Sequence, residues 1–280
     1  VISGSSKNLT KTGTGTVILR GTSTYSGTTT VSAGTLNIGG SGSLGSGTYA
    51  GNISNSGTFT YASSTAQTLS GVISGSGALT KSGSSTLTLS GTNTYSGDTT
   101  ISAGAVSVSG LLGSGTYAGA IANISTLTLS SSSAQTLSGV ISGSGGITKS
   151  GSGDLTLSGN NTTTGTISLS SGNLIAGSDN AFGSTPTISA SNTPTLKTSD
   201  GVTLPSLEVT GDIILETSVA TTGAQIYNND VQIKGTGNSL TSSGSNITIS
   251  GDVAAWSNTG ILQLRYNGSY IFDGGSAANA

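Results

Sequence analysis

The residue types that most enzymes use for nucleophilic and metal chemistry are missing from this sequence, which contains no His and no Cys among its 280 residues. Ser-His-Asp and Cys-His catalysis are therefore excluded, as are metal sites that need imidazole or thiolate ligands. The many serine and threonine hydroxyls are weak nucleophiles without a neighbouring base. We expect no enzymatic activity, no catalytic residue, no metal ligand and no cofactor.

Carboxylates are the remaining candidates for chemistry, because many glycosidases work with a pair of acidic groups. Asp98, Asp154 and Asp179 lie tens of residues apart, each beside Gly or Asn as in a turn. Calcium at such turns is an alternative to a structural role, although the Gly-Gly-x-Gly-x-Asp repeat of calcium-binding solenoids is absent.

The densest acidic group consists of Glu208, Asp212 and Glu216. Asp212 follows Gly211, as expected for a turn residue. A paired-carboxylate site at this group stays open as an alternative to a turn, and it would make the protein a polysaccharide-acting enzyme.

The composition favours an elongated repeat array. Gly supplies 46 of the 280 residues, Ser and Thr together exceed a third, and charged residues make up 6%. Helix is disfavoured because Ser and Thr compete for backbone hydrogen bonds and Gly costs about 1 kcal/mol per helical position. The net charge of −2 does not predict a nucleic acid or a membrane surface as partner. No run approaches the roughly 18 apolar residues of a membrane span.

Residues 79–106, LTKSGSSTLTLSGTNTYSGDTTISAGAV, show the pattern from which most of the chain is built. The segment contains three strand signals, at 79–81, 86–90 and 99–102, separated by turns that contain Gly. Side chains alternate across a strand, so the two leucines of the middle strand share one face and its hydroxyl residues share the other.

This unit is repeated, because the motif Val-Ile-Ser-Gly begins at residues 1, 72 and 140, in steps of 71 and 68 residues. Each unit is predicted to form about three coils of roughly 20–25 residues, stacked about 4.8 Å apart. The fold class is therefore predicted to be all-β, a right-handed parallel β-helix (β-solenoid) of about twelve coils, on the order of 60 Å long, with essentially no α-helix.

Several polar and aromatic residues recur at equivalent positions of the repeats. Lys11, Lys81 and Lys149 are equivalent, and at three coils apart they would lie roughly 14 Å from one another as solvated charges that protect strand edges. The recurring tyrosines form either an exposed aromatic ladder suited to sugars or, as we favour, rings packed over a turn. These tyrosines are Tyr25 with Tyr95, and Tyr49 with Tyr117.

Two further motifs are interpreted as structural. The Gly-x-Gly-x-x-Ala sequences at 45–50 and 113–118 resemble a dinucleotide-binding fingerprint, but no helix is predicted to follow them, so we interpret them as turns. Asparagines at strand ends are predicted to form turns or side-chain ladders; they are Asn8, Asn93, Asn160 and Asn161.

We divide the chain into three segments. Residues 1–183 form a β-solenoid of three repeats of about 70 residues, and the third copy stops resembling the others after about Leu174. Residues 184–205 contain all three prolines and are predicted to be irregular, because proline lacks the N–H that strand pairing needs. Residues 206–280 are predicted to continue the solenoid with a different, more charged repeat. Their strand signals are 207–209, 213–215, 231–234, 247–249 and 261–265.

The run 79–104, with weaker copies at 9–34 and 147–172, resembles the autotransporter-associated repeat found in passenger regions of Gram-negative type V secreted proteins. It departs from the family pattern at Ser85, where Gly is usual, and at Asp98. The part from 225 to 253 is similar to repeats of haemagglutinin-like passengers. The resemblance implies a right-handed parallel β-helix that is extracellular or displayed on the bacterial cell surface.

These observations favour a non-catalytic structural fibre or stalk. Self-association through the solenoid ends is expected, because an end coil exposes unpaired backbone groups above an apolar column and Val1 opens directly on a repeat. The absence of Met indicates a processed product or a fragment. The alternative is an adhesin that binds glycans or host surfaces, with a groove in the 183–205 region.

Overall fold

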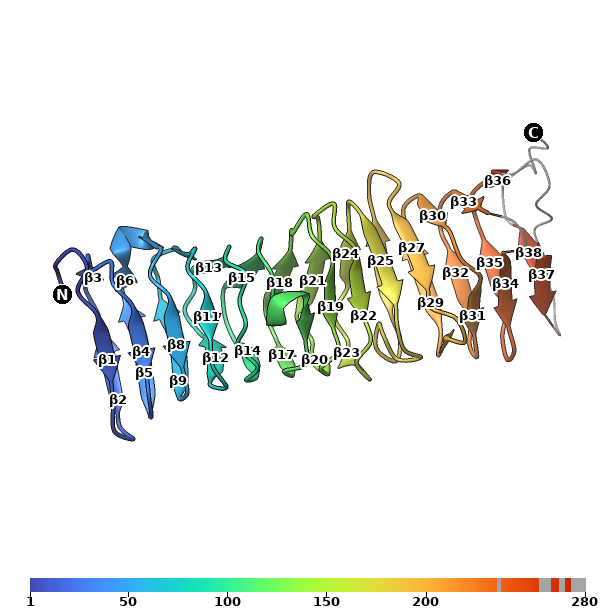
Figure 1. The fold of residues 1–280 in the computed structure, drawn as a ribbon. Helices are drawn as coiled ribbons and strands as arrows, with labels where there is room; N and C mark the ends of the chain where they lie inside the picture. Colours follow the sequence, from blue (N-terminus) through green and yellow to red (C-terminus); the bar gives the residue numbers. More distant parts are fainter. Residues whose placement is uncertain (236–237, 257–262, 267–269, 273–280) are drawn as a thin grey trace.

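The structure, a computed structural model, describes residues 1–235, 238–256, 263–266 and 270–272; for residues 255–256 and the last two strands the backbone alone is described. The chain winds into an elongated rod, with β1 (Leu9–Lys11) near one end and β38 (Tyr270–Phe272) near the other (Figure 1). Every strand pair in this part of the chain is parallel, and the longest sheet has 12 strands. Helix is confined here to two single 3-10 turns, η1 (Gly45–Gly47) and η2 (Gly113–Gly115). The prediction of a parallel β-solenoid of about twelve coils is confirmed.

The strands stack on three long faces of the rod, and most coils contribute a strand to all three in turn. Face 1 consists of β1 (Leu9–Lys11), β4 (Thr29–Val31), β8 (Ile53–Asn55), β11 (Ile73–Ser74), β16 (Thr116–Tyr117), β19 (Gln135–Leu137), β22 (Leu155–Leu157), β25 (Asn173–Ala176), β27 (Thr195–Thr198), β30 (Ile213–Leu215), β33 (Val231–Lys234) and β36 (Val253–Trp256).

Face 2 follows face 1 along the chain. It consists of β2 (Thr16–Leu19), β5 (Thr35–Gly40), β9 (Thr58–Ser63), β12 (Ala78–Lys81), β14 (Thr99–Ile101), β17 (Ile121–Asn123), β20 (Ile141–Gly143), β23 (Thr162–Thr163), β28 (Thr203–Leu204), β31 (Val219–Thr221), β34 (Ser239–Ser242) and β37 (Gln263–Tyr266).

Face 3 closes each coil. It consists of β3 (Thr22–Ser23), β6 (Ser43–Leu44), β7 (Thr48–Tyr49), β10 (Gln67–Leu69), β13 (Thr86–Leu89), β15 (Ala105–Val108), β18 (Thr126–Leu129), β21 (Gly146–Lys149), β24 (Ile167–Leu169), β26 (Thr187–Ala190), β29 (Leu207–Thr210), β32 (Gln225–Tyr227), β35 (Ile247–Ile249) and β38 (Tyr270–Phe272).

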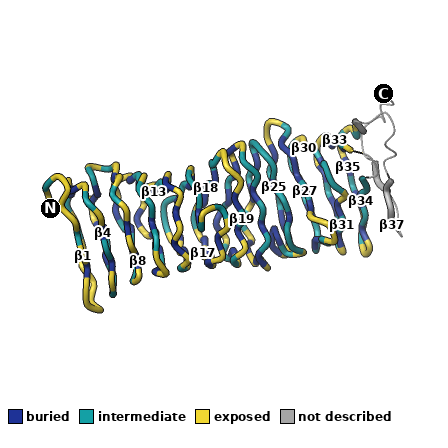
Figure 2. Tube along the Cα trace, in the orientation of Figure 1, coloured by how far each residue is buried: buried dark blue, intermediate teal, exposed yellow. Residues whose placement is uncertain are grey.

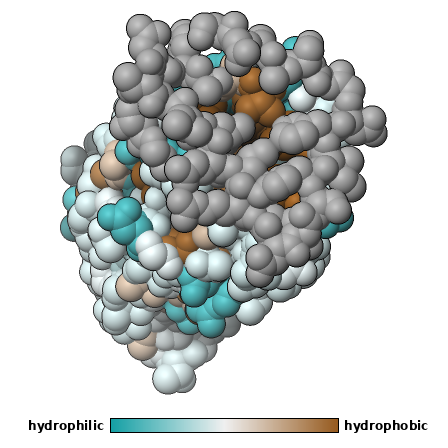
Figure 3. Space-filling view, turned by 90° about the vertical axis from the view of Figure 1, so that its right-hand side faces the viewer, coloured by the Kyte–Doolittle hydropathy of each residue, from teal (hydrophilic) through white to brown (hydrophobic). Residues whose placement is uncertain are grey.

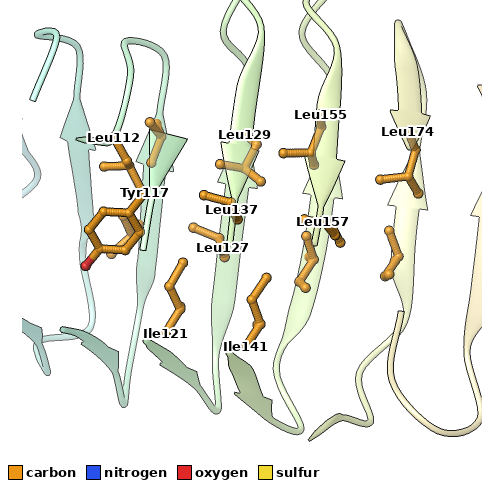
Figure 4. Packing of buried hydrophobic residues seen from close by; sticks show 14 of the residues in the cluster. Leu112, Tyr117, Ile121, Leu127, Leu129, Leu137, Ile141, Leu155, Leu157 and Leu174 are labelled. Carbon is orange, nitrogen blue, oxygen red and sulfur yellow. The ribbon is translucent and has the colours of Figure 1, made fainter. Parts of the chain in front are cut away.

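The core is a column that runs along the rod. Strand residues alternate between buried and more exposed (Figure 2), as in β13, where Leu87 and Leu89 are buried. Because the strands are in register, each inward side chain lies on its neighbours in the adjacent coils, and all three faces contribute to the interior (Figure 4). Each such aliphatic side chain stabilises the fold by about 1.5–3 kcal/mol when fully buried.

The 70-residue repeat is not a whole number of coils. Three coil steps lead from β1 through β4 and β8 to β11 on face 1, and the second Leu-Thr-Lys then follows one strand later, in β12 on face 2. The next repeat makes the same three steps, from β12 to β20, and places the third copy in β21 on face 3. Each repeat thus spans three coils and one further strand, close to the predicted value of about three coils, and successive repeats are turned by a third of a coil.

The proline-containing segment 184–205 is not irregular, contrary to the prediction from the sequence. It contains β26 and β27, which pair in parallel with the coils on either side, and β28, which pairs in parallel with β31 of the following coil. Pro186 and Pro194 precede strands and Pro205 follows one, so the missing N–H of each proline lies outside the strand itself. The carbonyls of these prolines still accept backbone hydrogen bonds from the next coil.

The solenoid continues beyond this segment with the same three faces. The strands predicted at 207–209, 213–215, 231–234 and 247–249 correspond to β29, β30, β33 and β35. Of the strand predicted at 261–265, residues 261–262 lie outside the described residues, and the rest falls in β37.

Candidate functional site

The three equivalent lysines are interior residues, and the prediction that they are solvated edge charges is wrong. Lys11, Lys81 and Lys149 are 5%, 0% and 2% exposed. They end β1, β12 and β21, which lie on three different faces, so they do not form a row along the rod. The alternation of side chains along the strand could have predicted this burial. Each lysine comes two residues after an inward aliphatic residue and therefore points inward as well.

Each lysine ammonium binds backbone carbonyls of the turn that follows its strand and of the next coil. Lys11 Nζ donates to Thr12 O and Gly13 O at 2.7 Å and to Ala33 O at 3.1 Å. Lys81 Nζ donates to the carbonyl of Gly83 and, at 3.2 Å, to that of Ala103. The lysine thus joins two coils at a turn.

Lys149 repeats this arrangement with the carbonyls of Gly151 and Ser171, the latter at 2.9 Å. Burial lowers the pKa of Lys81 and of Lys149, because a charged ammonium is desolvated in the interior; for Lys149 the carboxylate of Asp154 opposes the shift. These are structural cations, and they do not form a binding stripe.

The recurring tyrosines are buried in pairs around a threonine. Tyr95 Oη lies 2.8 Å from Thr99 Oγ1, which lies 2.8 Å from Tyr117 Oη. Tyr117 Oη also donates to the carbonyl of Gly97, so Thr99 donates to Tyr117 and Tyr95 donates to Thr99. The two rings lie 5.2 Å apart between centroids. This hydrogen-bonded chain satisfies three hydroxyls that would otherwise be unpaired in the interior.

The same chain occurs in the first repeat and is lost in the third. In the first repeat, Thr29 Oγ1 lies 2.7 Å from both Tyr25 Oη and Tyr49 Oη. In the third repeat, Thr163 and Ile167 occupy the positions of Tyr95 and Thr99. The packed interpretation of the tyrosines is confirmed for these residues, and they cannot form an exposed ladder for sugars.

The buried tyrosines predict a loss of stability at alkaline pH. Burial raises the pKa of Tyr95 well above its ordinary value of 10.0, and it also raises the pKa of Tyr25, Tyr49 and Tyr117. Because the folded pKa is raised, this stability is fully present below pH 10 and is lost as the pH rises from there towards the folded pKa. Phenolate absorbance is expected to rise in one cooperative step together with the loss of β-sheet circular dichroism. Complete titration of the folded protein near pH 10 would contradict this.

The asparagines and the Gly-x-Gly motifs are structural, as interpreted. Asn8, Asn93 and Asn161 each accept a backbone N–H from a residue 20 positions away, and Asn160 accepts a hydrogen bond from Asn180. The Gly-x-Gly motifs form the single turns η1 and η2 and do not begin a helix.

The isolated aspartates connect neighbouring coils. Asp98 and Asp179 each accept a backbone N–H at 2.9 and 2.8 Å, and Asp154 accepts the side-chain amide of Asn173 at 2.7 Å. Within the described residues, no group of three or more acidic side chains is arranged to hold a metal ion.

The three carboxylates of the densest acidic group are not brought together in one site. Glu208 lies on β29 of face 3 and accepts the amide of Asn228 at 3.2 Å, whereas Asp212 lies in the following turn and accepts the N–H of Asp230 at 3.3 Å. Glu216 follows β30 on face 1, and it pairs with Lys197 at 2.8 Å and with Lys234 at 3.9 Å. This placement does not favour a paired-carboxylate site.

A polar groove, which we name the corner groove, lies where face 1 turns into face 2, next to β27 and β31. It has a cavity volume of about 330 Å³. The groove falls partly within the 183–205 region. It is lined by Thr198, Ser199, Asp200, Gly201, Val202, Thr203, Thr217, Ser218, Ala220 and Asn238. No sequence motif marked it, because its residues come from separate coils.

The fold and the internal position of the repeated polar residues define the class of the protein as a parallel β-solenoid repeat protein. Residues 9–38, 79–108 and 147–176 match the passenger-associated-transport-repeat family, and the solenoid thus contains three copies of this repeat. The repeats and the fold fit a passenger domain of type V secretion. Searches of curated proteins and of solved structures gave no significant match. The haemagglutinin-like resemblance of residues 225–253 was not matched and stays a prediction.

The repeat indicates an exported or surface protein. No helix in the described part of the chain is long and apolar enough to cross a membrane.

Proposed function

We propose that this chain is a non-catalytic passenger segment that serves as a stiff stalk or fibre outside the cell. The observation that carries the proposal is the presence of three passenger-associated repeats on one uninterrupted parallel solenoid. The repeated polar residues bind backbone groups of neighbouring coils, and this supports a role in stiffness. Of the residues coloured by hydropathy in Figure 3, most are pale, that is, of intermediate hydropathy.

The shape of the purified chain tests the stalk. About twelve coils stacked 4.8 Å apart predict rods on the order of 60 Å long in electron micrographs and in small-angle X-ray scattering. A compact, roughly spherical particle would contradict the proposal.

The location of the protein is tested with antibodies against the chain. They are expected to label intact cells or the culture medium of the native organism, and a signal confined to lysed cells would count against export.

End-to-end association is the finer part of this proposal. Val17 lies in β2, which pairs with β5. Association through coil edges predicts filaments several rod lengths long at raised protein concentration, which a Lys substitution at Val17 would shorten. Single rods at every protein concentration would refute end-to-end association and leave the stalk proposal unaffected.

A further inference from the structure

The corner groove has a wall that is fixed by hydrogen bonds between coils. Thr198 N donates to Thr217 Oγ1 at 2.7 Å, and Thr198 Oγ1 donates to Ser218 O at 2.6 Å. The rim is a tight turn in which Val202 N donates to Ser199 O at 3.2 Å. The groove is therefore preformed, which reduces the entropy lost when a ligand binds.

Unused polar groups gather at this rim. The exposed carboxylate of Asp200 makes no hydrogen bond and no ion pair within the described structure, whereas Asp98, Asp154 and Asp179 each accept one. The hydroxyls of Ser199 and Thr203 also have no partner among the described residues, although both residues line the groove. The groove thus offers a charged acceptor beside two hydroxyls that can donate or accept.

The lining also excludes several ligand classes. Among the described residues that line the groove there is no Lys or Arg, so phosphates, sulfates and acidic sugars would meet a carboxylate without a compensating cation. The described lining also contains no aromatic side chain, so flat hydrophobic rings would find no stacking partner there. Val202 and Ala220 add small apolar surfaces between the polar groups. A polar ligand without negative charge, with neighbouring hydroxyls and short apolar patches, matches this lining.

We propose that the corner groove binds one or two rings of a neutral saccharide. The Asp200 carboxylate accepts hydrogen bonds from two adjacent sugar hydroxyls, and these charge-assisted bonds are stronger than neutral ones. Ser199 and Thr203 bind further hydroxyls, while Ala220 contacts the C–H face of a ring. The volume of about 330 Å³ is at the lower end of the range for ligand pockets, which fits a ligand of this size. The inference goes beyond the stalk function, since a stalk needs no such site.

Binding of the full chain to an array of neutral, amino and acidic oligosaccharides tests the proposal, followed by titration calorimetry with the best neutral glycan. Asp200→Asn keeps the shape of the side chain and removes its charge, and we expect it to weaken binding at least about tenfold. Ala220→Gln fills the groove from the outward position of β31, and we expect a similar loss.

Two matched variants serve as controls. Asp98→Asn changes an aspartate in a distant turn, and Ala122→Gln changes the equivalent outward position of β17 on the same face. Both are expected to bind like the parent, and circular dichroism establishes that all four variants fold.

Several results would overturn the proposal. They are the absence of any neutral glycan bound at millimolar concentration, a preference for acidic glycans, and neutral binding that survives both groove substitutions in folded protein. Rods that bind no saccharide would refute the groove inference and leave the stalk proposal intact. Compact particles that bind a neutral saccharide would refute the stalk proposal and support the groove inference.

Discussion

Replacing Leu127 by Ala is expected to lower the free energy of unfolding by about 2–5 kcal/mol. Leu127 is 1% exposed at the centre of the rod, stacked between Val106 of β15 and Ile147 of β21. Figure 4 shows its side chain in the interior of the rod among residues of the other faces. Truncation leaves a cavity, and the coils on either side cannot close it, because their spacing is set by backbone hydrogen bonds.

Urea unfolding followed by circular dichroism measures this loss. Thr128→Ala is the matched control, because Thr128 is the adjacent, outward-facing residue of the same strand, and we expect a change of less than about 1 kcal/mol. Since solenoids can unfold in parts, hydrogen exchange on β15, β18 and β21 is the second measurement. Equal losses for the two variants would contradict an interior column.

The alternation of residues in the sequence was enough to predict this column. Leu87 and Leu89 alternate with hydroxyl residues, and the same pattern recurs at fixed intervals, so the parallel solenoid and its interior could be predicted without coordinates. The lysines show the limit of this reasoning. Lys81 has the inward parity of Leu79, but its charge argued for solvent, and the carbonyls that bind it belong to turns whose geometry the sequence did not reveal.

The rotation between repeats could not be predicted from the period. A period of 70 residues fits three long coils or three shorter coils and one extra strand, and the strand pairing decides between them. Turns such as η1 lengthen individual coils, so that Thr29 and Ile53 pair although they are 24 residues apart, against 20 for Leu9 and Thr29. A groove was expected in the 183–205 region, but the residues that complete the corner groove, Thr217, Ser218, Ala220 and Asn238, could not be predicted, because they come from other coils.

Replacing Lys81 by Met is expected to destabilise the protein by about 2–4 kcal/mol, although it removes a buried charge. Methionine fills a similar volume, but it leaves the carbonyls of Gly83 and Ala103 without their donor, at about 1–3 kcal/mol for each buried group. The lowered pKa of Lys81 shows that desolvation offsets part of what the ammonium contributes. Buried charges are often replaced without loss by apolar residues when both partners are replaced, but here the carbonyls belong to the backbone and remain.

Lys197→Met is the matched control, because Lys197 is partly exposed and pairs with Glu216 on the outer surface. Such a surface pair contributes about 0–1 kcal/mol, so the urea midpoint of this variant is expected to stay close to that of the parent. In Lys81→Met the amide protons of β12 and β14, the strands joined at this turn, are expected to exchange faster than those of β31 and β34. A Met variant at least as stable as the parent would mean that the turn finds other donors, such as water, and that the lysine is not needed to join the coils.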